Sequence, residues 1–99
     1  MNVEYLEIGR VCVSRAGHDK NSLYMVFQIV DEKYVMLVDG TKRTTDNPKK
    51  KKVRHIKYIP FLLENQAKRI MDGKSVHDFE IAKALEEVRT TISIKGKEG

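Results

Sequence analysis

The sequence predicts a mainly β domain with an α-helical C-terminal extension. Three short apolar runs, separated by clusters of turn-forming residues, fill the first forty positions, which is the spacing of a small meander that curls into a barrel. Towards the other end, apolar residues recur every three positions, as they do along one face of a helix. A length of 99 residues suits one domain with an appended element.

The first strand is expected around Val11 and Val13, because these residues alternate with neighbours of other types. Turn formers follow at 16–22, where Gly17 is the structural turn residue, since glycine adopts a positive φ without a steric penalty. A second strand is expected at 23–30. It is apolar enough to be buried on much of both faces.

A tight turn at 31–33 leads into the third strand, at 34–38. Asp39 and Gly40 follow, and this pair is a strong stop signal for a strand. The first forty residues therefore predict three strands joined by short connections.

Positive charge is concentrated at 41–57. This stretch holds eight Lys or Arg residues against one acid, Asp46, for a net charge of +7, while the other eleven Lys or Arg and thirteen Asp or Glu leave the rest of the chain at −2. We expect a basic loop at 41–52, followed by a fourth strand at 53–59. Charge that is focused in this way suits a phosphate backbone.

Two helices are expected after the fourth strand. Pro60 can serve as the first helical residue of a short helix over 61–71. Ser75 and Asp78 have the spacing of a capping box for a longer helix over 76–89. The apolar face of this longer helix is predicted to pack on the barrel, and it consists of Phe79, Ala82, Leu85 and Val88.

These elements divide the chain into a barrel at 1–59, a helical extension packed on it at 60–92 and a flexible polar tail at 93–99. The β-branched stretch 90–94 is open to two interpretations, a short strand or the start of the tail.

The first two strands carry a resemblance to the KOW motif, through residues 9–35, G-R-V-C-V-S-R-A-G-H-D-K-N-S-L-Y-M-V-F-Q-I-V-D-E-K-Y-V. That motif has a Gly-bounded apolar strand, a hairpin glycine (here Gly17) and a polar loop that often reads Asp-Lys before a second apolar strand. The continuation through 35–43 and 51–59 is similar to large-subunit ribosomal proteins of the L-fourteen-e type. It looks most like their short bacterial relatives, the KOW-domain RNA-binding proteins.

The resemblance implies a small SH3-like barrel that binds RNA, usually ribosomal RNA. One departure from the motif is Asn21, which stands where many KOW sequences have a second glycine. Asparagine also tolerates a left-handed conformation, so we expect the turn to be kept. The helical region from Pro60 onward lies outside the motif.

Candidate RNA-binding residues come from the basic segment and from the first hairpin. Lysine is a flexible point charge for phosphate, whereas Arg43 and Arg54 can grip phosphate bidentately or stack on a base. Tyr58 adjoins the basic strand and is favoured over Tyr24 and Tyr34 as a stacking platform. Each group also has a purely structural interpretation. The basic segment could be a solvated loop, the first hairpin an ordinary polar turn, and the tyrosines core residues. The candidates are Arg15, His18, Lys20, Lys42, Arg43, Lys49, Lys50, Lys51, Lys52, Arg54, Lys57 and Tyr58.

No cofactor, metal or enzymatic activity is predicted. Cys12 is the single cysteine, which rules out an intramolecular disulfide and suits a reducing compartment. The Cys and His residues lack zinc-ligand spacing, and there is no P-loop or nucleophile elbow. The N-terminus does not read as a signal peptide and no apolar run is long enough for a membrane span, so we expect a soluble cytoplasmic protein.

Two classes of function follow from these observations. The first is an RNA-binding module that contacts ribosomal RNA, as a ribosomal protein or as a ribosome-associated assembly or translation factor. The alternative is a protein-interaction module that docks on a ribosomal protein or RNA polymerase without direct RNA contact. Duplex DNA is disfavoured because the helix at 76–89 carries only Lys83 and Arg89 against four acids. The isolated chain is expected to be a monomer, with ribosomal RNA and other ribosomal proteins as partners.

Overall fold

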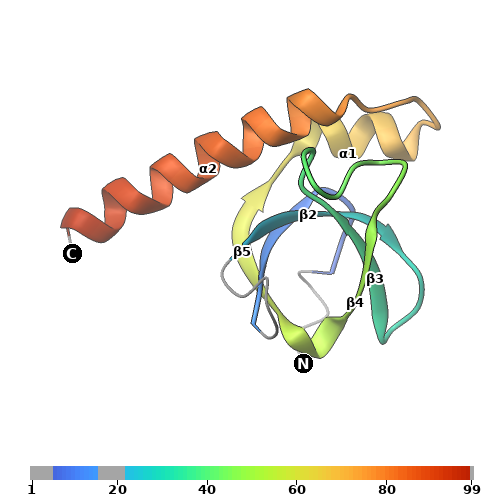
Figure 1. The fold of residues 1–99 in the computed structure, drawn as a ribbon, viewed down its shortest axis with the longest axis horizontal. Helices are drawn as coiled ribbons and strands as arrows, with labels where there is room; N and C mark the ends of the chain where they lie inside the picture. Colours follow the sequence, from blue (N-terminus) through green and yellow to red (C-terminus); the bar gives the residue numbers. More distant parts are fainter. Residues whose placement is uncertain (1–5, 16–21, 99) are drawn as a thin grey trace.

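A computed structural model describes residues 6–15 and 22–98. Its strands form one antiparallel sheet in the order β4-β3-β2-β1-β5, which curls into a small barrel with two helices over one end (Figure 1). The predicted mainly β fold with a helical C-terminal extension is therefore confirmed. The elements are β1 (Arg10–Ser14), β2 (Leu23–Ile29), β3 (Tyr34–Val38), β4 (Lys49–Lys52), the 3-10 helix η2 (Val53–His55), β5 (Ile56–Leu62), α1 (Glu64–Met71) and α2 (Asp78–Glu98).

The sheet is buried on both faces where it is most apolar. One core lies between the sheet and the helices, and it contains Val11, Leu23, Met25, Val38, Ile81, Leu85 and Val88. The second core fills the barrel, and it contains Cys12, Tyr24, Val26, Val35, Leu37, Val53 and Ile56. Successive residues of a strand point to opposite faces, so the first four residues of β2 alternate between the two cores. The expectation of a second strand buried on both faces is confirmed for these four residues.

The tight connections follow the predicted turn chemistry. The Asp31 carboxylate accepts hydrogen bonds from the backbone N–H groups of Lys33 (2.8 Å) and Tyr34 (2.9 Å), which closes the turn between β2 and β3. Gly40, just after β3, has a φ of +82°, in the region that favours glycine.

The lysine run differs from the prediction of a loop, because Lys49–Lys52 form β4 and pair with β3. Hydrogen bonding to a neighbouring strand can hold an extended segment that has no apolar alternation of its own. The predicted strand at 53–59 is also wrong in its bounds. Its first three residues form η2, and β5 runs on to Leu62 with Pro60 inside it. Proline is tolerated there because β5 is at the edge of the sheet.

The first helix begins later than predicted, at Glu64, because the residues around Pro60 belong to β5. The second begins at Asp78, two residues later than expected, and the carboxylate of this residue accepts a hydrogen bond from Thr45 instead of completing a capping box with Ser75.

The apolar face of α2 is made by Ile81, Leu85 and Val88, which are buried, with Ala82 half-buried beside them. Phe79 was predicted on this face but is 71% exposed. Two helical positions separate Phe79 from Ile81, or a rotation of about 200°, so the two side chains leave opposite sides of the helix.

The C-terminal stretch continues α2 as far as Glu98, over the residues expected as a strand or as a flexible tail. Thr90 and Thr91 donate side-chain hydrogen bonds to the backbone oxygens of Glu86 and Glu87, one turn back (3.1 and 3.0 Å). The helix crosses the barrel and projects beyond it (Figure 1).

Candidate nucleic-acid interface

Strand β4 places four consecutive lysines at one edge of the sheet. Lys49 and Lys51 lie opposite the buried residues Leu37 and Val35 and are half-buried, while Lys50 and Lys52 are exposed. A lysine can pack its aliphatic stem on apolar surface and keep its ammonium group in water. The strand therefore presents positive charge on both faces of the edge.

The ring of Tyr34 lies beside these lysines. Lys50 Nζ is 4.6 Å from the centre of this ring, within the range of a cation–π contact. Lys52 is the direct cross-strand neighbour of Tyr34, so the contact from Lys50 is diagonal across the strand pair. Tyr34 is thus the aromatic side chain that β4 brings into the basic surface.

The short helix η2 gathers further cations at the end of the barrel. The Arg15 backbone N–H donates to the His55 carbonyl oxygen (2.7 Å), and the Val53 N–H donates to the Lys33 carbonyl oxygen (2.8 Å). These bonds bring the end of β1 and the turn between β2 and β3 against η2, next to the exposed Arg54. We call the combined surface the cationic face, made of Arg15, Lys33, Lys49, Lys50, Lys51, Lys52, Arg54 and His55.

The imidazole of His55 responds to this concentration of charge. Partial desolvation, and then the positive charges of Arg54, Lys52, Lys51 and Arg15, lower the pKa of His55 from its ordinary value. Four cations from two separate segments therefore act on one ring. A surface of this kind favours an anionic ligand.

Lys33 belongs to the cationic face but was not among the predicted site residues. It lies in a turn whose local sequence also contains two acids, Asp31 and Glu32, so the sequence offers no net positive signal there. The hydrogen bond from Val53 and the pairing of Tyr34 with Lys52 place this turn beside η2.

The segment between β3 and β4 carries Lys42 and Arg43 on an ordered loop. The Asp39 carboxylate accepts hydrogen bonds from the backbone N–H groups of Thr41 and Arg43, both at 2.9 Å. The Arg43 carbonyl oxygen in turn accepts from Asp39 and Gly40 (2.8 and 3.2 Å). Lys42 is exposed and Arg43 half-buried, and both lie towards the helical end of the molecule because the same loop contacts α2.

Two candidates on β5 lie apart from β4. Lys57 is exposed and pairs with Val13 across the strands, whereas Tyr58 pairs with Cys12 and packs against the core inside the barrel. Burial, and then the neighbouring Cys12, raise the pKa of the Tyr58 hydroxyl. The structure thus places Tyr58 mainly with the core and Tyr34 with the cationic face.

Three residues of the first hairpin, Gly17, His18 and Lys20, lie outside the described residues. Their predicted roles stay predictions.

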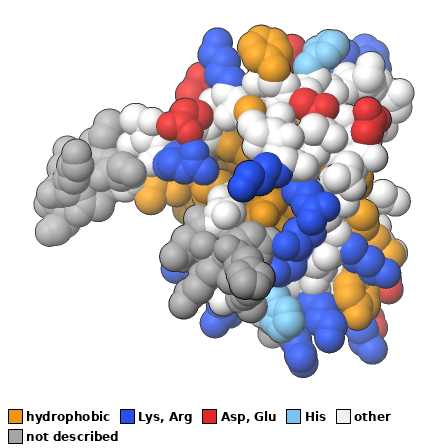
Figure 2. Space-filling model, viewed as in Figure 1, with side chains coloured by type: hydrophobic (Ala, Val, Ile, Leu, Met, Phe, Trp, Pro, Cys, Tyr) orange, Lys and Arg blue, Asp and Glu red, His pale blue; other side chains and the backbone are white. Residues whose placement is uncertain are grey.

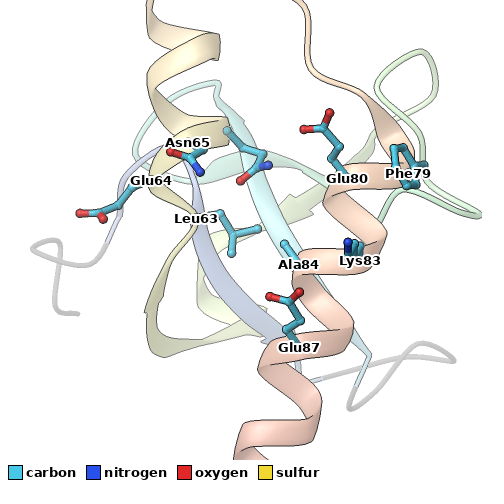
Figure 3. Close-up of a pocket in the computed structure, with 9 residues that line it drawn as sticks. Leu63, Glu64, Asn65, Phe79, Glu80, Lys83, Ala84 and Glu87 are labelled. Carbon is cyan, nitrogen blue, oxygen red and sulfur yellow. The ribbon is translucent and has the colours of Figure 1, made fainter.

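The opposite end of the molecule has a different character. A groove of about 590 Å³ lies between the start of α1 and the first turns of α2, and Figure 3 shows Leu63 and Ala84 facing one another across it. Its lining residues include three acids, Glu64, Glu80 and Glu87, and one cation, Lys83. In Figure 2, Lys and Arg side chains gather over the lower half of the molecule, around β4 and η2. A phosphate backbone is therefore favoured at the barrel end and disfavoured in the groove.

The described residues offer few signs of other functions, such as a reactive thiol, a metal site or a membrane span. Cys12 is fully buried, and burial raises the pKa of its thiol to about 12, so it is not poised for reaction. Within residues 6–15 and 22–98, no cluster of His, Cys, Asp and Glu is arranged to hold a metal ion. No helix in this part of the chain has the length and apolarity needed to cross a bilayer.

The fold and the surface together define a small β-barrel with a basic edge strand and a helical extension. No protein-family model matches the chain. Among curated proteins, it is similar to large ribosomal subunit protein eL14 of Saccharolobus solfataricus, with 34% identity over 92 residues, covering 93% of this chain and 88% of that protein. The corresponding protein of Desulfurococcus amylolyticus is 37% identical over 82 residues, covering 83% of this chain and 78% of its own length.

The eL14 protein of Hyperthermus butylicus is also similar, with 31% identity over 87 residues, covering 83% of this chain and 76% of that protein. This chain belongs to the eL14 family of large ribosomal subunit proteins. The resemblance to proteins of the L-fourteen-e type is thereby confirmed. The shared length exceeds the KOW-like strands and so includes part of the helical extension.

Proposed function

We propose that this chain is a ribosomal protein that binds ribosomal RNA of the large subunit through its cationic face. The observation that carries the proposal is the edge strand of four lysines, which Arg54, Arg15 and Lys33 extend around the end of the barrel. The family relationship supports the ribosomal setting, since the relatives are named as proteins of the large ribosomal subunit.

In this proposal, the lysines of β4 neutralise phosphates as mobile point charges and release condensed counterions. Arg54 supplies a planar group that can hold a phosphate with two hydrogen bonds, and Arg43, in the loop before β4, offers a second such group outside the cationic face. Tyr34 offers an aromatic edge next to the lysines, where an unpaired base can pack. Most of these contacts carry no sequence information, so the RNA is recognised chiefly by the spacing of its backbone.

Lysines on an edge strand have a simpler explanation, because they discourage strand pairing between molecules. That explanation accounts for Lys50 and Lys52, but not for Arg15 and Arg54, which lie beyond the strand. The convergence of three separate segments on one positive surface favours a ligand.

One argument for the alternative function, a module that binds proteins without RNA contact, was that the apolar stripe of the C-terminal helix could bind a partner. The apolar stripe of α2 packs inside the molecule through Ile81, Leu85 and Val88, so it is not available to a partner. We retain the related predictions that the chain has no enzymatic activity, is monomeric when isolated and acts on cytoplasmic ribosomes alongside other ribosomal proteins.

The test compares two triple variants that remove equal charge. The first replaces Lys50, Lys52 and Arg54 with serine, and all three side chains are exposed on the cationic face. The control replaces three exposed lysines of the helical region with serine, namely Lys68, Lys74 and Lys83. Affinity for deproteinised large-subunit ribosomal RNA is measured by filter binding, with a thermal melt of each variant.

Loss of three phosphate contacts at about 0.1 M salt should weaken binding roughly tenfold to a hundredfold for the first variant. The control should bind within about threefold of the natural chain, because its charges lie away from the interface. Equal losses in the two variants would show that net charge alone drives binding. No loss in the first variant would refute the proposed interface.

A further inference from the structure

The first turn of α2 rests directly on the loop between β3 and β4. A Cβ atom built on Gly40 would lie 2.2 Å from the Asp78 carbonyl oxygen and 2.7 Å from the Ala82 nitrogen. Gly40 also has a φ of +82°, which other residue types rarely adopt. Glycine at this position therefore permits a backbone contact between the loop and the helix.

A side-chain contact joins the same two segments a few residues further along. The Asp78 carboxylate accepts a hydrogen bond through Oδ1 from the Thr45 backbone N–H (2.8 Å), and its Oδ2 lies 3.5 Å from the Thr45 hydroxyl. These residues are 33 positions apart in the chain, and their contact is partly buried. A charged acceptor shielded from water makes a stronger hydrogen bond than an exposed neutral one.

Lys42 and Arg43 lie between these two attachment points. The Asp39 carboxylate holds the intervening backbone through Thr41 and Arg43. The chain then enters β4 at Lys49, four residues after Thr45. The direction in which the loop presents its two cations relative to the lysines of β4 is therefore set by contacts with α2.

We propose that Asp78 is a positioning residue for the RNA interface, which holds Lys42 and Arg43 in register with the lysines of β4 so that one RNA backbone meets both groups. The proposal rests on the function proposed above and extends it by including the C-terminal helix. A preorganised loop binds better than a mobile one because less conformational freedom is lost on binding.

The direction in which RNA affinity changes on removal of the Asp78 carboxylate distinguishes a positioning role from simple electrostatics. Asp78 is a carboxylate near a basic segment, so removing its charge should strengthen RNA binding if charge alone matters. If Asp78 acts by positioning, Asp78→Ala should weaken binding, although the variant is more positive than the natural chain. The same substitution thus gives opposite results under the two explanations.

The experiment measures binding of full-length variants to deproteinised large-subunit ribosomal RNA over a range of salt concentrations. We expect Asp78→Ala to bind roughly tenfold more weakly, with a salt slope shallower by about one, as for the loss of one or two phosphate contacts. Asp78→Asn keeps an oxygen acceptor for Thr45 and should recover most of the affinity. Asp46→Asn is the charge control, because Asp46 is exposed in the same loop, and it should bind as well as or better than the natural chain.

Binding by Asp78→Ala that equals or exceeds that of the natural chain would overturn the positioning role. The proposed function would still stand if the triple variant at Lys50, Lys52 and Arg54 binds weakly in the same assay. If that triple variant also binds normally, both proposals fall. Should Asp78→Ala not fold, Asp78→Glu replaces it: because it keeps the charge, charge alone predicts unchanged binding, whereas the positioning role predicts weaker binding, since the added methylene displaces the carboxylate from Thr45.

Discussion

His55 lies in η2, where its carbonyl oxygen holds the end of β1 and its ring meets the charges of the cationic face. Partial desolvation and four neighbouring cations lower the pKa of this ring, so they favour its neutral form. An RNA phosphate placed on the same surface would have the opposite effect on His55. The pKa of His55 can therefore be used to detect RNA bound at the cationic face.

We predict that His55 titrates below about 6.5, the ordinary value for histidine, and that its midpoint rises when RNA binds. Because the unfolded chain then binds more protons than the folded chain, the contribution of His55 to stability is complete above pH 6.5 and declines as the pH falls below it. RNA affinity should rise over the same interval, since binding takes up a proton.

NMR titration of the assigned ring resonances, with and without RNA, measures both effects. A His55 midpoint that stays fixed on RNA addition would place the RNA elsewhere.

Helix α2 contributes to the molecule in two ways. Its buried residues Ile81, Leu85 and Val88 close the core between sheet and helices, while its first turn holds the loop that carries Lys42 and Arg43. The exposed Phe79 takes part in neither packing arrangement, because it points to the other side of the helix.

Leu85→Ala should lower the free energy of unfolding by about 2–5 kcal/mol, because it leaves a cavity in a closed core. Phe79→Ala removes a larger side chain from the same helix but should change stability by less than about 0.5 kcal/mol, since the ring is already exposed. Urea denaturation followed by circular dichroism compares the two. Similar losses for both variants would mean that Phe79 is buried in solution and that the helix is seated differently.

Charge is distributed unevenly over the folded chain. The segment 41–57 has a net charge of +7 against −2 for the rest, and folding brings Arg15 and Lys33 beside its η2 portion. The residues that line the groove between the helices include three glutamates and one lysine. An approaching nucleic acid is therefore attracted to the cationic face rather than to the groove, which orients the encounter.

RNA affinity should fall steeply with salt. If the cationic face makes about four to six phosphate contacts, log K plotted against log salt should have a slope of roughly −3 to −4 on single-stranded RNA. Filter binding at five or more salt concentrations gives the slope directly, and the control variant at Lys68, Lys74 and Lys83 should keep it. A flat response would contradict a phosphate-based interface at any affinity.

Much of the fold was readable from short stretches of sequence. The strands around Val11, at 23–30 and at 34–38 were predicted because their turn signals and apolar patterns are local. The buried helix positions Leu85 and Val88 followed from the helical period in the same way. The basic residues of the candidate site were also visible as a concentration of charge.

Other features depended on contacts between distant segments. Lys49–Lys52 form a strand because β3 supplies the hydrogen-bonding partner, and Pro60 remains in β5 because an edge strand can lack one N–H donor. The place of Lys33 beside η2 and the bond between Asp78 and Thr45 join residues far apart in the chain.

Local sequence thus established which segments are apolar, where turns fall and where charge accumulates, because each of these depends on neighbouring residues. The tertiary structure decided which charges share a surface and which backbone is extended. Those outcomes depend on hydrogen-bonding partners that only the folded sheet brings within reach.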